Sequence, residues 1–211
     1  MKLIVFDCDS TLSAIEGIDE LARLRGEETF TEIEALTHAA MNGEVAIDQI
    51  FSRRLDIIRP GRNECSAVGE LYIRDIEPTA ISTLKLLRER GWTAVILSGG
   101  FTQVIEPLAA YLGIDEVHAV PLKFDSNGLY SGFDHDAPPT RNGGKPEIIR
   151  LLKAQHQPER IIMVGDGISD LETKDEVDLF IGFGRYAARE AVIQGADHFI
   201  NSLDELAAYC E

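Results

Sequence analysis

A small set of carboxylates, one hydroxyl and one ammonium group stands out because each follows a short apolar segment or a pair of glycines. The set consists of Asp7, Asp9, Ser98, Lys145, Asp166 and Asp170. Clustered carboxylates cannot all stay ionised without a cation between them. The chain has no Cys/His cluster, and hard oxygen ligands favour Mg²⁺ over zinc. Magnesium, a lysine, a hydroxyl and bare backbone amides together form a set that binds a phosphoryl group.

Asp7 and Asp9 are two residues apart, which allows a division of roles between two carboxylates. One can attack phosphorus to form an aspartyl-phosphate. The other can handle the proton of the leaving oxygen and later that of water. Gly99 and Gly100, directly after Ser98, let backbone N–H groups approach an anion closely. Each cluster alone is more typical of a solvated loop or a surface residue, so it is their joint placement that favours a phosphoryl-transfer site.

The elements that must position these residues alternate between strands and helices. Strands are predicted at Lys2–Phe6, Thr93–Leu97, Val117–Val120, Arg160–Val164, Leu179–Ile181 and His198–Ile200, with a hairpin around Asn127-Gly128. Helices are predicted at Ala80–Arg90, Thr102–Leu112, Pro146–Ala154, Ala187–Ile193 and Leu203–Ala208. This alternation predicts an α/β protein with a doubly wound, mostly parallel, Rossmann-like sheet. Active sites of such sheets lie at the carboxyl ends of the strands, where the polar set falls.

Residues 15–75 interrupt the alternation immediately after the first strand. Apolar residues recur there at helical spacing, and glycines and Pro60 separate the runs, which predicts three or four short helices and no strand. We therefore expect a small helical cap at 15–75, inserted into an α/β core formed by residues 1–14 and 76–211.

The composition excludes several classes of protein. The 211 residues are 45% hydrophobic and 27% charged, which is ordinary for a globular domain and argues against disorder. The net charge of -16 repels polyanions, so nucleic acid and anionic membranes are poor partners. No apolar run approaches the roughly 18 residues of a membrane span. Three widely spaced cysteines without a CxxC motif fit a reducing cytoplasm. A monomer and a homodimer both remain open.

Four motifs occur in the order DxDST-L, SGG, a lysine and GDGISD, each at the end of a strand or the start of a helix. This arrangement resembles the haloacid dehalogenase-like phosphatases over essentially the whole chain, including a helical cap between the first two motifs. The resemblance implies that Asp7 is the nucleophile and Asp9 the general acid/base. It also implies that Ser98 and Lys145 hold the transferring phosphoryl group.

The same resemblance implies a magnesium site. Asp166 would complete this site together with Asp7 and the backbone carbonyl of Asp9. Asp170 would be a nearby carboxylate, either a ligand or a support for the ligands. Ser169 stands where the family usually has Asn or Thr, and would contact the substrate.

Within this superfamily, the segments EGIDELA (16–22), AMNG (40–43), RRL (53–55) and IGFG (181–184) resemble the phosphoserine phosphatase family. In that family a cap glutamate meets the substrate ammonium group and a cap arginine meets its carboxylate. Glu16 and Arg54 match those positions, and Met41 matches an apolar cap contact. The chemistry agrees, because a planar guanidinium binds a carboxylate through two hydrogen bonds. Arg53, beside Arg54, leaves open which of the two arginines faces the substrate.

The predicted function is that of an Mg²⁺-dependent phosphomonoester hydrolase acting on O-phospho-L-serine, the last step of serine biosynthesis. Phosphoethanolamine, phosphocholine or transfer to another acceptor are alternatives that keep the same chemistry. A non-enzymatic phospho-receiver module is an alternative of a different class. Asp9 and the cap oppose it, since a surface switch needs neither an adjacent base nor a cover. Arg185 replaces a family glycine and either adds positive charge near the site or is merely exposed.

Overall fold

Six strands, all parallel, form the central sheet, and the computed structural model describes every residue from 1 to 211. The strand order is β3-β2-β1-β6-β7-β8. The strands are β1 (Lys2–Phe6), β2 (Trp92–Phe101), β3 (Glu116–Val120), β6 (Arg160–Gly165), β7 (Leu179–Phe183) and β8 (His198–Ile200). The chain proceeds from β1 to β2 and β3 on one side, then returns to β6 on the other. The order thus reverses at β1 and β6, which is where parallel sheets open a crevice for ligands.

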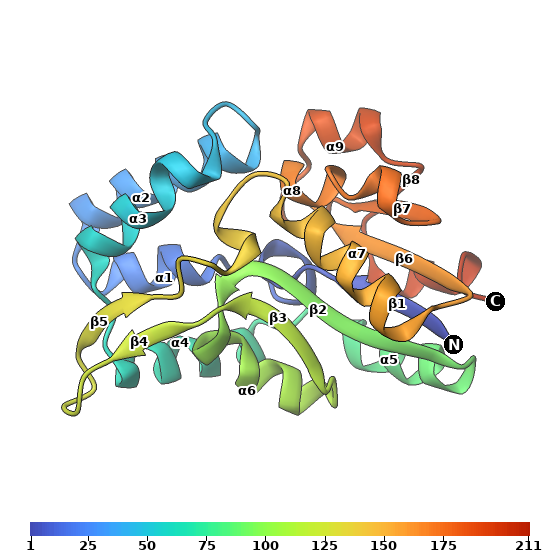
Figure 1. Ribbon diagram of the computed structural model, residues 1–211, viewed down its shortest axis with the longest axis horizontal. Helices are drawn as coiled ribbons and strands as arrows, with labels where there is room; N and C mark the ends of the chain where they lie inside the picture. The colour runs from blue at the N-terminus through green and yellow to red at the C-terminus, as the bar shows by residue number, and fades with distance from the viewer.

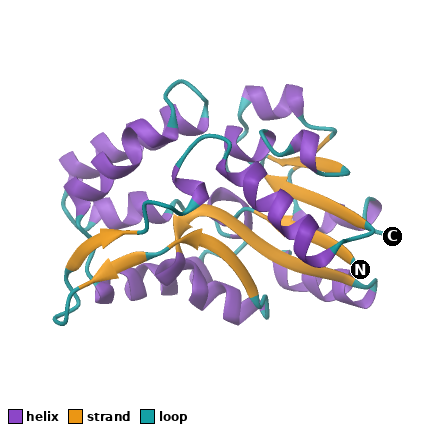
Figure 2. Ribbon diagram, in the orientation of Figure 1, coloured by secondary structure: helices purple, strands orange, loops and turns teal.

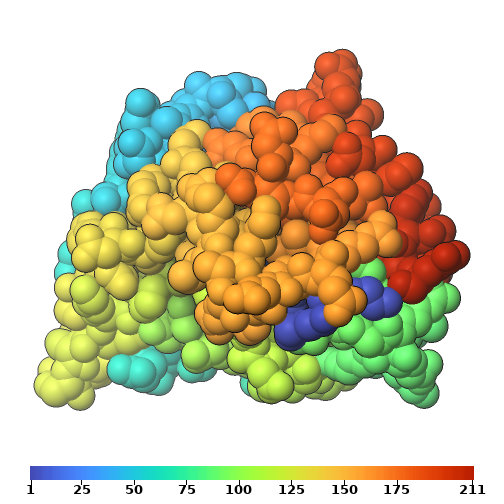
Figure 3. All heavy atoms as spheres, turned by 45° about the vertical axis from the view of Figure 1, so that its right-hand side comes forward, coloured from blue at the N-terminus to red at the C-terminus, as the bar shows by residue number.

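Helices cover both faces of the sheet (Figure 1). Ile4 and Phe6 of β1 face α5 (Ala80–Glu89), α6 (Thr102–Leu112) and the 3₁₀ segment Leu203–Ala208. Leu3 and Val5 face α7 (Gly144–His156) and α9 (Glu190–Gly195). Strand β1 is therefore apolar on both faces, as a central parallel strand must be. Leu3, Ile4, Val5 and Phe6 are fully buried, and on the face drawn in Figure 3 the N-terminal residues appear as a small dark-blue area.

Four helices occupy the segment between β1 and α5. They are α1 (Gly17–Arg23), α2 (Glu27–Met41), α3 (Ile47–Ile58) and α4 (Arg62–Arg74), and we refer to them as the helical insertion. Figure 1 shows α2 and α3 apart from the sheet, whereas α4 lies alongside α6. Gly69 permits this close approach, because a Cβ there would lie 3.0 Å from Pro107 Cγ. The predicted class, a doubly wound parallel sheet with an inserted helical cap, is confirmed.

The insertion is joined to the rest of the protein by two adjacent chain segments and by contacts at its far end. Ser13 and Ile76 form an antiparallel bridge where the chain enters and leaves the insertion. At the far end, Asn142 Oδ1 accepts a hydrogen bond of 2.8 Å from the backbone N–H of Ile47, the first residue of α3. A hairpin of β4 (Leu122–Phe124) and β5 (Tyr130–Phe133) also meets the insertion, and Figure 2 shows it separate from the main sheet.

Several element boundaries differ from those predicted, including those of β2, α7 and α9. Strand β2 continues to Phe101 through a register irregularity after Leu97, so Ser98, Gly99 and Gly100 lie within the strand and not beyond it. The helix predicted from Ala187 begins only at Glu190, and the preceding residues form an irregular loop. Helix α7 begins at Gly144, two residues earlier than predicted. The remaining elements are a π-helical turn (Cys8–Leu12), α8 (Ile168–Leu171) and short 3₁₀ turns at Pro138–Thr140 and Lys174–Glu176. No helix combines the length and apolar character needed to cross a bilayer.

Candidate active site

Asp7 occupies the first position after the central strand β1. Its backbone N–H donates to the carbonyl of Val164 in β6, so the sheet ladder fixes the backbone that carries the side chain. The carboxylate is buried, and its Oδ1 accepts a hydrogen bond of 2.7 Å from the backbone N–H of Cys8. A buried carboxylate held in this way keeps one orientation relative to the strand end.

Lys145 lies in the first turn of α7 and is almost completely buried. Its Nζ is 3.1 Å from Asp7 Oδ1 and 2.6 Å from Asp170 Oδ1. Burial alone would lower the pKa of Lys145, but the two carboxylates outweigh burial and raise it above its ordinary value. Lys145 therefore stays protonated and offers a fixed positive charge beside Asp7.

Asp166 directly follows β6 and lies in the same cavity as Asp7 and Lys145. Its Oδ1 accepts a hydrogen bond from Thr11 Oγ1 at 3.1 Å, and its Oδ2 accepts one from Arg189 Nε at 3.3 Å. Burial and the charge of Asp7 raise the pKa of Asp166 to about 7, although Arg189 partly opposes this rise. The site thus carries more negative charge than its own cations neutralise.

Asp7, Asp166 and Asp170 fit a divalent cation. All three are buried, and one carboxylate oxygen from each lies within 4.8 Å of the others. The donor set is made of oxygen alone, which suits Mg²⁺ better than a softer metal. The elevated pKa of Asp166 has the same cause, since clustered carboxylates need a cation to stay ionised together.

Asp9 is held by three donors. Its Oδ1 accepts hydrogen bonds from the backbone N–H of Gly17, at 2.7 Å, and from the Tyr72 hydroxyl. Its Oδ2 accepts one from Ser98 Oγ at 3.0 Å. Burial and the charge of Asp7 raise the pKa of Asp9, which favours its protonated form. Burial and the charge of Asp9 raise the pKa of Tyr72, so its hydroxyl remains a donor.

Ser98 and the glycines after it form the side of the cavity near β2. Ser98 Oγ accepts a hydrogen bond of 2.9 Å from the N–H of Gly100. A Cβ at Gly100 would lie 2.8 Å from Asp9 Oδ2, so a side chain there would displace the carboxylate. Ser98, Gly99 and Gly100 all line the cavity, where a hydroxyl and bare amides face whatever enters it.

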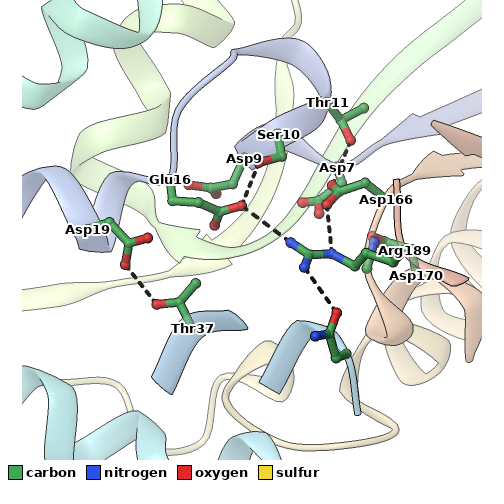
Figure 4. Close-up of polar contacts among 12 residues, drawn as sticks. Asp7, Asp9, Ser10, Thr11, Glu16, Asp19, Thr37, Asp166, Asp170 and Arg189 are labelled. Carbon is green, nitrogen blue, oxygen red and sulfur yellow. Dashed lines mark hydrogen bonds and ion pairs between the residues drawn. The ribbon is translucent and has the colours of Figure 1, made fainter. Parts of the chain in front are cut away.

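Glu16 precedes α1 and is held from two sides (Figure 4). Ser10 Oγ donates to Glu16 Oε1 at 2.6 Å, and Arg189 Nη2 lies 4.0 Å from the same oxygen. Ser10 has a positive φ of 51°, a left-handed conformation that is uncommon for residues other than glycine. Burial, followed by the charges of Asp9 and Asp166, raises the pKa of Glu16 well above its ordinary value. A cationic ligand next to Glu16 would stabilise the ionised form of this carboxyl group.

Arg54, in α3, is buried and incompletely hydrogen-bonded. Its Nη1 donates to Thr37 Oγ1 at 3.2 Å, and Thr37 donates in turn to Asp19 Oδ1 at 2.7 Å. Its Nε is buried without any hydrogen-bond partner. An unpaired donor on a buried cation is costly, and an anionic ligand in the cavity would satisfy it.

The two other arginines left open by the sequence lie away from the cavity. The Arg53 side chain is 61% exposed and pairs with Glu32 on the surface at 2.8 Å. Arg185 Nη1 lies 3.4 Å from Glu77 Oε1, so Arg185 adds no charge to the cavity.

One cavity collects nearly all of the residues predicted to be functional. Those that line it are Asp7, Asp9, Glu16, Met41, Arg54, Ser98, Gly99, Gly100, Lys145, Asp166 and Ser169. Asp170 does not line the cavity but is buried behind Lys145. The cavity therefore has one end at the sheet edge, which is rich in carboxylates and hydrogen-bond donors, and another end formed by the helical insertion.

Sequence reasoning missed Arg189 and Tyr72. Arg189 contacts one residue at each end of the cavity, Asp166 and Glu16 (Figure 4). Its Nη1 also donates to Asn42 Oδ1 at 3.4 Å. No spacing pattern links these residues. Thr11, by contrast, is part of the first motif, and its position there was a signal that could have been used.

Comparisons with known proteins agree with this geometry. The profile of the haloacid dehalogenase-like hydrolase family matches residues 4–173, and the chain belongs to this family. Among curated relatives, the phosphoserine phosphatase of Bos taurus is 37% identical over 205 residues, which cover 96% of this chain and 90% of the relative. The chloroplastic phosphoserine phosphatase of Arabidopsis thaliana is 32% identical and covers 98% of this chain and 70% of its own length. The chain is accordingly an enzyme of the phosphoric monoester hydrolase class.

Solved structures lead to the same family. A phospho-aspartyl intermediate analogue of phosphoserine phosphatase superposes with a TM-score of 0.87 at 28% identity, covering 100% of this chain and 99% of the other. A substrate-bound phosphoserine phosphatase complex superposes with a TM-score of 0.87 at 27% identity, covering 100% and 98%.

Proposed function

We propose that this enzyme hydrolyses O-phospho-L-serine to serine and phosphate through an aspartyl-phosphate on Asp7. The observation that carries the choice of substrate is the pair of opposite charges contributed by the helical insertion. Glu16 offers a carboxylate and Arg54 an unpaired guanidinium Nε, both lining the cavity that also holds Asp7. A phosphorylated amino acid presents an ammonium group, a carboxylate and a phosphate, which match these three places.

The chemistry divides into two balanced steps. In the first, a carboxylate oxygen of Asp7 bonds to phosphorus as the bond to the seryl oxygen breaks, and Asp9 gives its proton to that oxygen. In the second, water attacks phosphorus, Asp9 takes the proton of the water, and the bond to Asp7 breaks. Lys145 and Ser98 bind the oxygens of the phosphoryl group that is transferred, and Gly99 and Gly100 add backbone N–H donors.

Asp7, Asp166 and the backbone carbonyl of Asp9 would hold magnesium, with Asp170 supporting the site. When bound, the ion neutralises the carboxylates and the phosphoryl oxygens, so that anionic reactants can approach each other. Asp170 also orients Lys145, to which it lies within 2.6 Å.

We further propose that residues 15–75 act as a cap on a core of residues 1–14 and 76–211. Ala14 and Glu77 support these boundaries, because each donates a backbone hydrogen bond of 2.9 Å across the two connecting segments. A cap that closes over the substrate excludes bulk water during the first step. Met41 would contribute an apolar contact, and Ser169 a hydroxyl.

A cytoplasmic role in serine biosynthesis completes the proposal. The three cysteines are buried and unpaired, which suits a reducing compartment.

Initial rates over a panel of small phosphate esters test the proposal, with and without Mg²⁺. We expect kcat/KM for phosphoserine to exceed that for phosphoethanolamine by at least about 10²-fold, because the latter leaves Arg54 unpaired. We also expect turnover to require Mg²⁺. Equal rates for the two esters would reject the substrate, whereas a phosphorylated chain that is stable for hours would favour a receiver module.

A further inference from the structure

The two oxygens of Asp9 have different surroundings. Oδ1 faces the helical insertion, where it accepts hydrogen bonds from the N–H of Gly17 and from the hydroxyl of Tyr72. Oδ2 faces the sheet, where it meets Ser98 Oγ at 3.0 Å and lies beside Gly100. Ser98 and Gly100 line the cavity, whereas Gly17 and Tyr72 do not. Oδ2 is therefore the oxygen of Asp9 whose neighbours line the cavity.

We propose that Tyr72 is a positioning residue that makes Oδ2 of Asp9 the oxygen that gives and takes the proton. A carboxylate oxygen has two lone-pair sites, and the donors Gly17 and Tyr72 occupy both sites of Oδ1. A proton on Oδ1 would break one of these buried hydrogen bonds, so the proton belongs on Oδ2. From Oδ2 it is directed into the cavity and toward the leaving oxygen. This inference rests on the acid/base role proposed above for Asp9.

The local structure is built around the Tyr72 ring. Tyr72 lies in the last turn of α4 and is fully buried. A Cβ at Gly17 would overlap the Tyr72 hydroxyl, so the contact requires glycine at the start of α1. Ser13 Oγ donates to the carbonyl of Tyr72 at 3.2 Å, which ties this turn to the segment that follows the first motif. The ring is thus held at the junction between the insertion and the sheet.

The proton balance assigns Tyr72 no transfer of its own. In the first step the Oδ2–H bond of Asp9 breaks, and the proton passes to the seryl oxygen as that oxygen leaves phosphorus. In the second step a proton of the attacking water passes to Oδ2. Tyr72 keeps its proton throughout and donates to Oδ1 in both protonation states of Asp9.

Substitution Tyr72→Phe removes the hydroxyl and leaves the ring. The test compares kcat/KM for phosphoserine and for acetyl phosphate, since kcat/KM reports the step that releases the leaving group. A seryl oxygen must be protonated as it leaves, whereas acetate leaves without a proton. We expect a loss of about 10- to 50-fold for phosphoserine, the effect of removing one hydrogen bond to a charged group, and less than about 3-fold for acetyl phosphate.

Two further variants separate the role of Tyr72 from that of Asp9 and from the mere loss of a tyrosine hydroxyl. Tyr111→Phe, at an exposed tyrosine of α6, should leave both rates unchanged, and Asp9→Asn should show the same selective loss in a stronger form. Equal losses of Tyr72→Phe on both substrates, or no loss, would overturn the role of Tyr72 while a selective Asp9→Asn leaves the proposed function standing. An Asp9→Asn variant without selectivity would overturn the acid/base assignment, and the inference with it.

Discussion

The carboxyl edge of the sheet and the helical insertion contribute to one cavity by different means. At the edge, Asp7 and Asp166 directly follow the adjacent strands β1 and β6, so the sheet ladder sets where their backbones lie. In the insertion, Glu16 and Arg54 come from separate parts of a helical unit, and packing between helices sets their positions. A sheet edge suits chemistry that needs fixed geometry, and a helical unit suits recognition that differs between substrates.

The charges of the two regions differ as well. The sheet edge buries several carboxylates against Lys145, an arrangement that favours a metal ion and a phosphate. The insertion supplies one carboxylate, from Glu16, and one guanidinium group, from Arg54, at separate points of the cavity, and this arrangement suits a zwitterionic ligand. Arg189 lies between them and contacts Asp166 on one side and Glu16 on the other. Mutations in the two regions should therefore have different dependence on the substrate.

The largest effect is expected at the sheet edge. Asp7→Asn removes the proposed nucleophile and should lower kcat by at least about 10³-fold for every phosphate ester. The loss should not depend on the substrate, because each ester transfers the same phosphoryl group. Phosphate-release assays with phosphoserine and with phosphoethanolamine measure this loss of kcat, and the melting temperature checks that the variant folds. Wild-type turnover by Asp7→Asn would end the aspartyl-phosphate mechanism.

A smaller and selective effect is expected in the insertion. Arg54→Ala should raise KM for phosphoserine by about 10- to 100-fold, the worth of a charge-assisted contact, and change KM for phosphoethanolamine by less than about 3-fold. Arg53→Ala is the matched control, since Arg53 is the adjacent arginine of the same helix but is exposed and paired with Glu32. If Arg54→Ala affected both substrates equally, the division of roles between the two regions would be wrong.

The same two regions differ in how far the sequence predicts them. Asp7, Ser98 and Asp166 could be placed together because the carboxyl ends of parallel strands meet at one edge. Lys145 was added to them because it follows two glycines at a helix start. Local patterns were sufficient for that, and β1 ends at the residue predicted. The extension of β2 through Ser98 was not predicted, because the register irregularity after Leu97 depends on how β2 and β3 pair.

Tyr72 and Arg189 were beyond prediction for a physical reason. The direction of the Tyr72 side chain depends on how α4 is rotated against α6, and close packing of Gly69 on Pro107 sets that rotation. Arg189 lies in a loop where a helix was predicted, and its partners are far apart in sequence. Periodicity describes which face of a helix is buried, but it does not specify which distant carboxylate a buried hydroxyl will meet.

The smallest predicted effect concerns Asp19, which accepts a hydrogen bond from Thr37, the partner of Arg54. A change at Asp19 therefore tests the electrostatics of the insertion and leaves the residues of the sheet edge unchanged. Burial raises the pKa of Asp19 to about 6, so the folded protein binds this proton more tightly than the unfolded chain does. The stability that wild-type Asp19 contributes is therefore present at low pH and is lost as the pH rises toward and through about 6. Asp19→Asn cannot lose a proton, so its stability relative to wild type should improve by about 2 kcal/mol between pH 4 and pH 7.

Urea unfolding of both proteins at a series of pH values measures this difference, since titrations shared by the two chains cancel. Glu28→Gln, at an exposed position of α2, is the control for the loss of one negative charge. Asp19→Asn should also raise KM for phosphoserine modestly, by about 3- to 10-fold, because Thr37 and Arg54 lose the charge that orients them. A stability difference independent of pH would mean that Asp19 is not a buried charge held in place for Arg54. The insertion would then resemble an ordinary helical cover, without the electrostatic design that distinguishes it from the sheet edge.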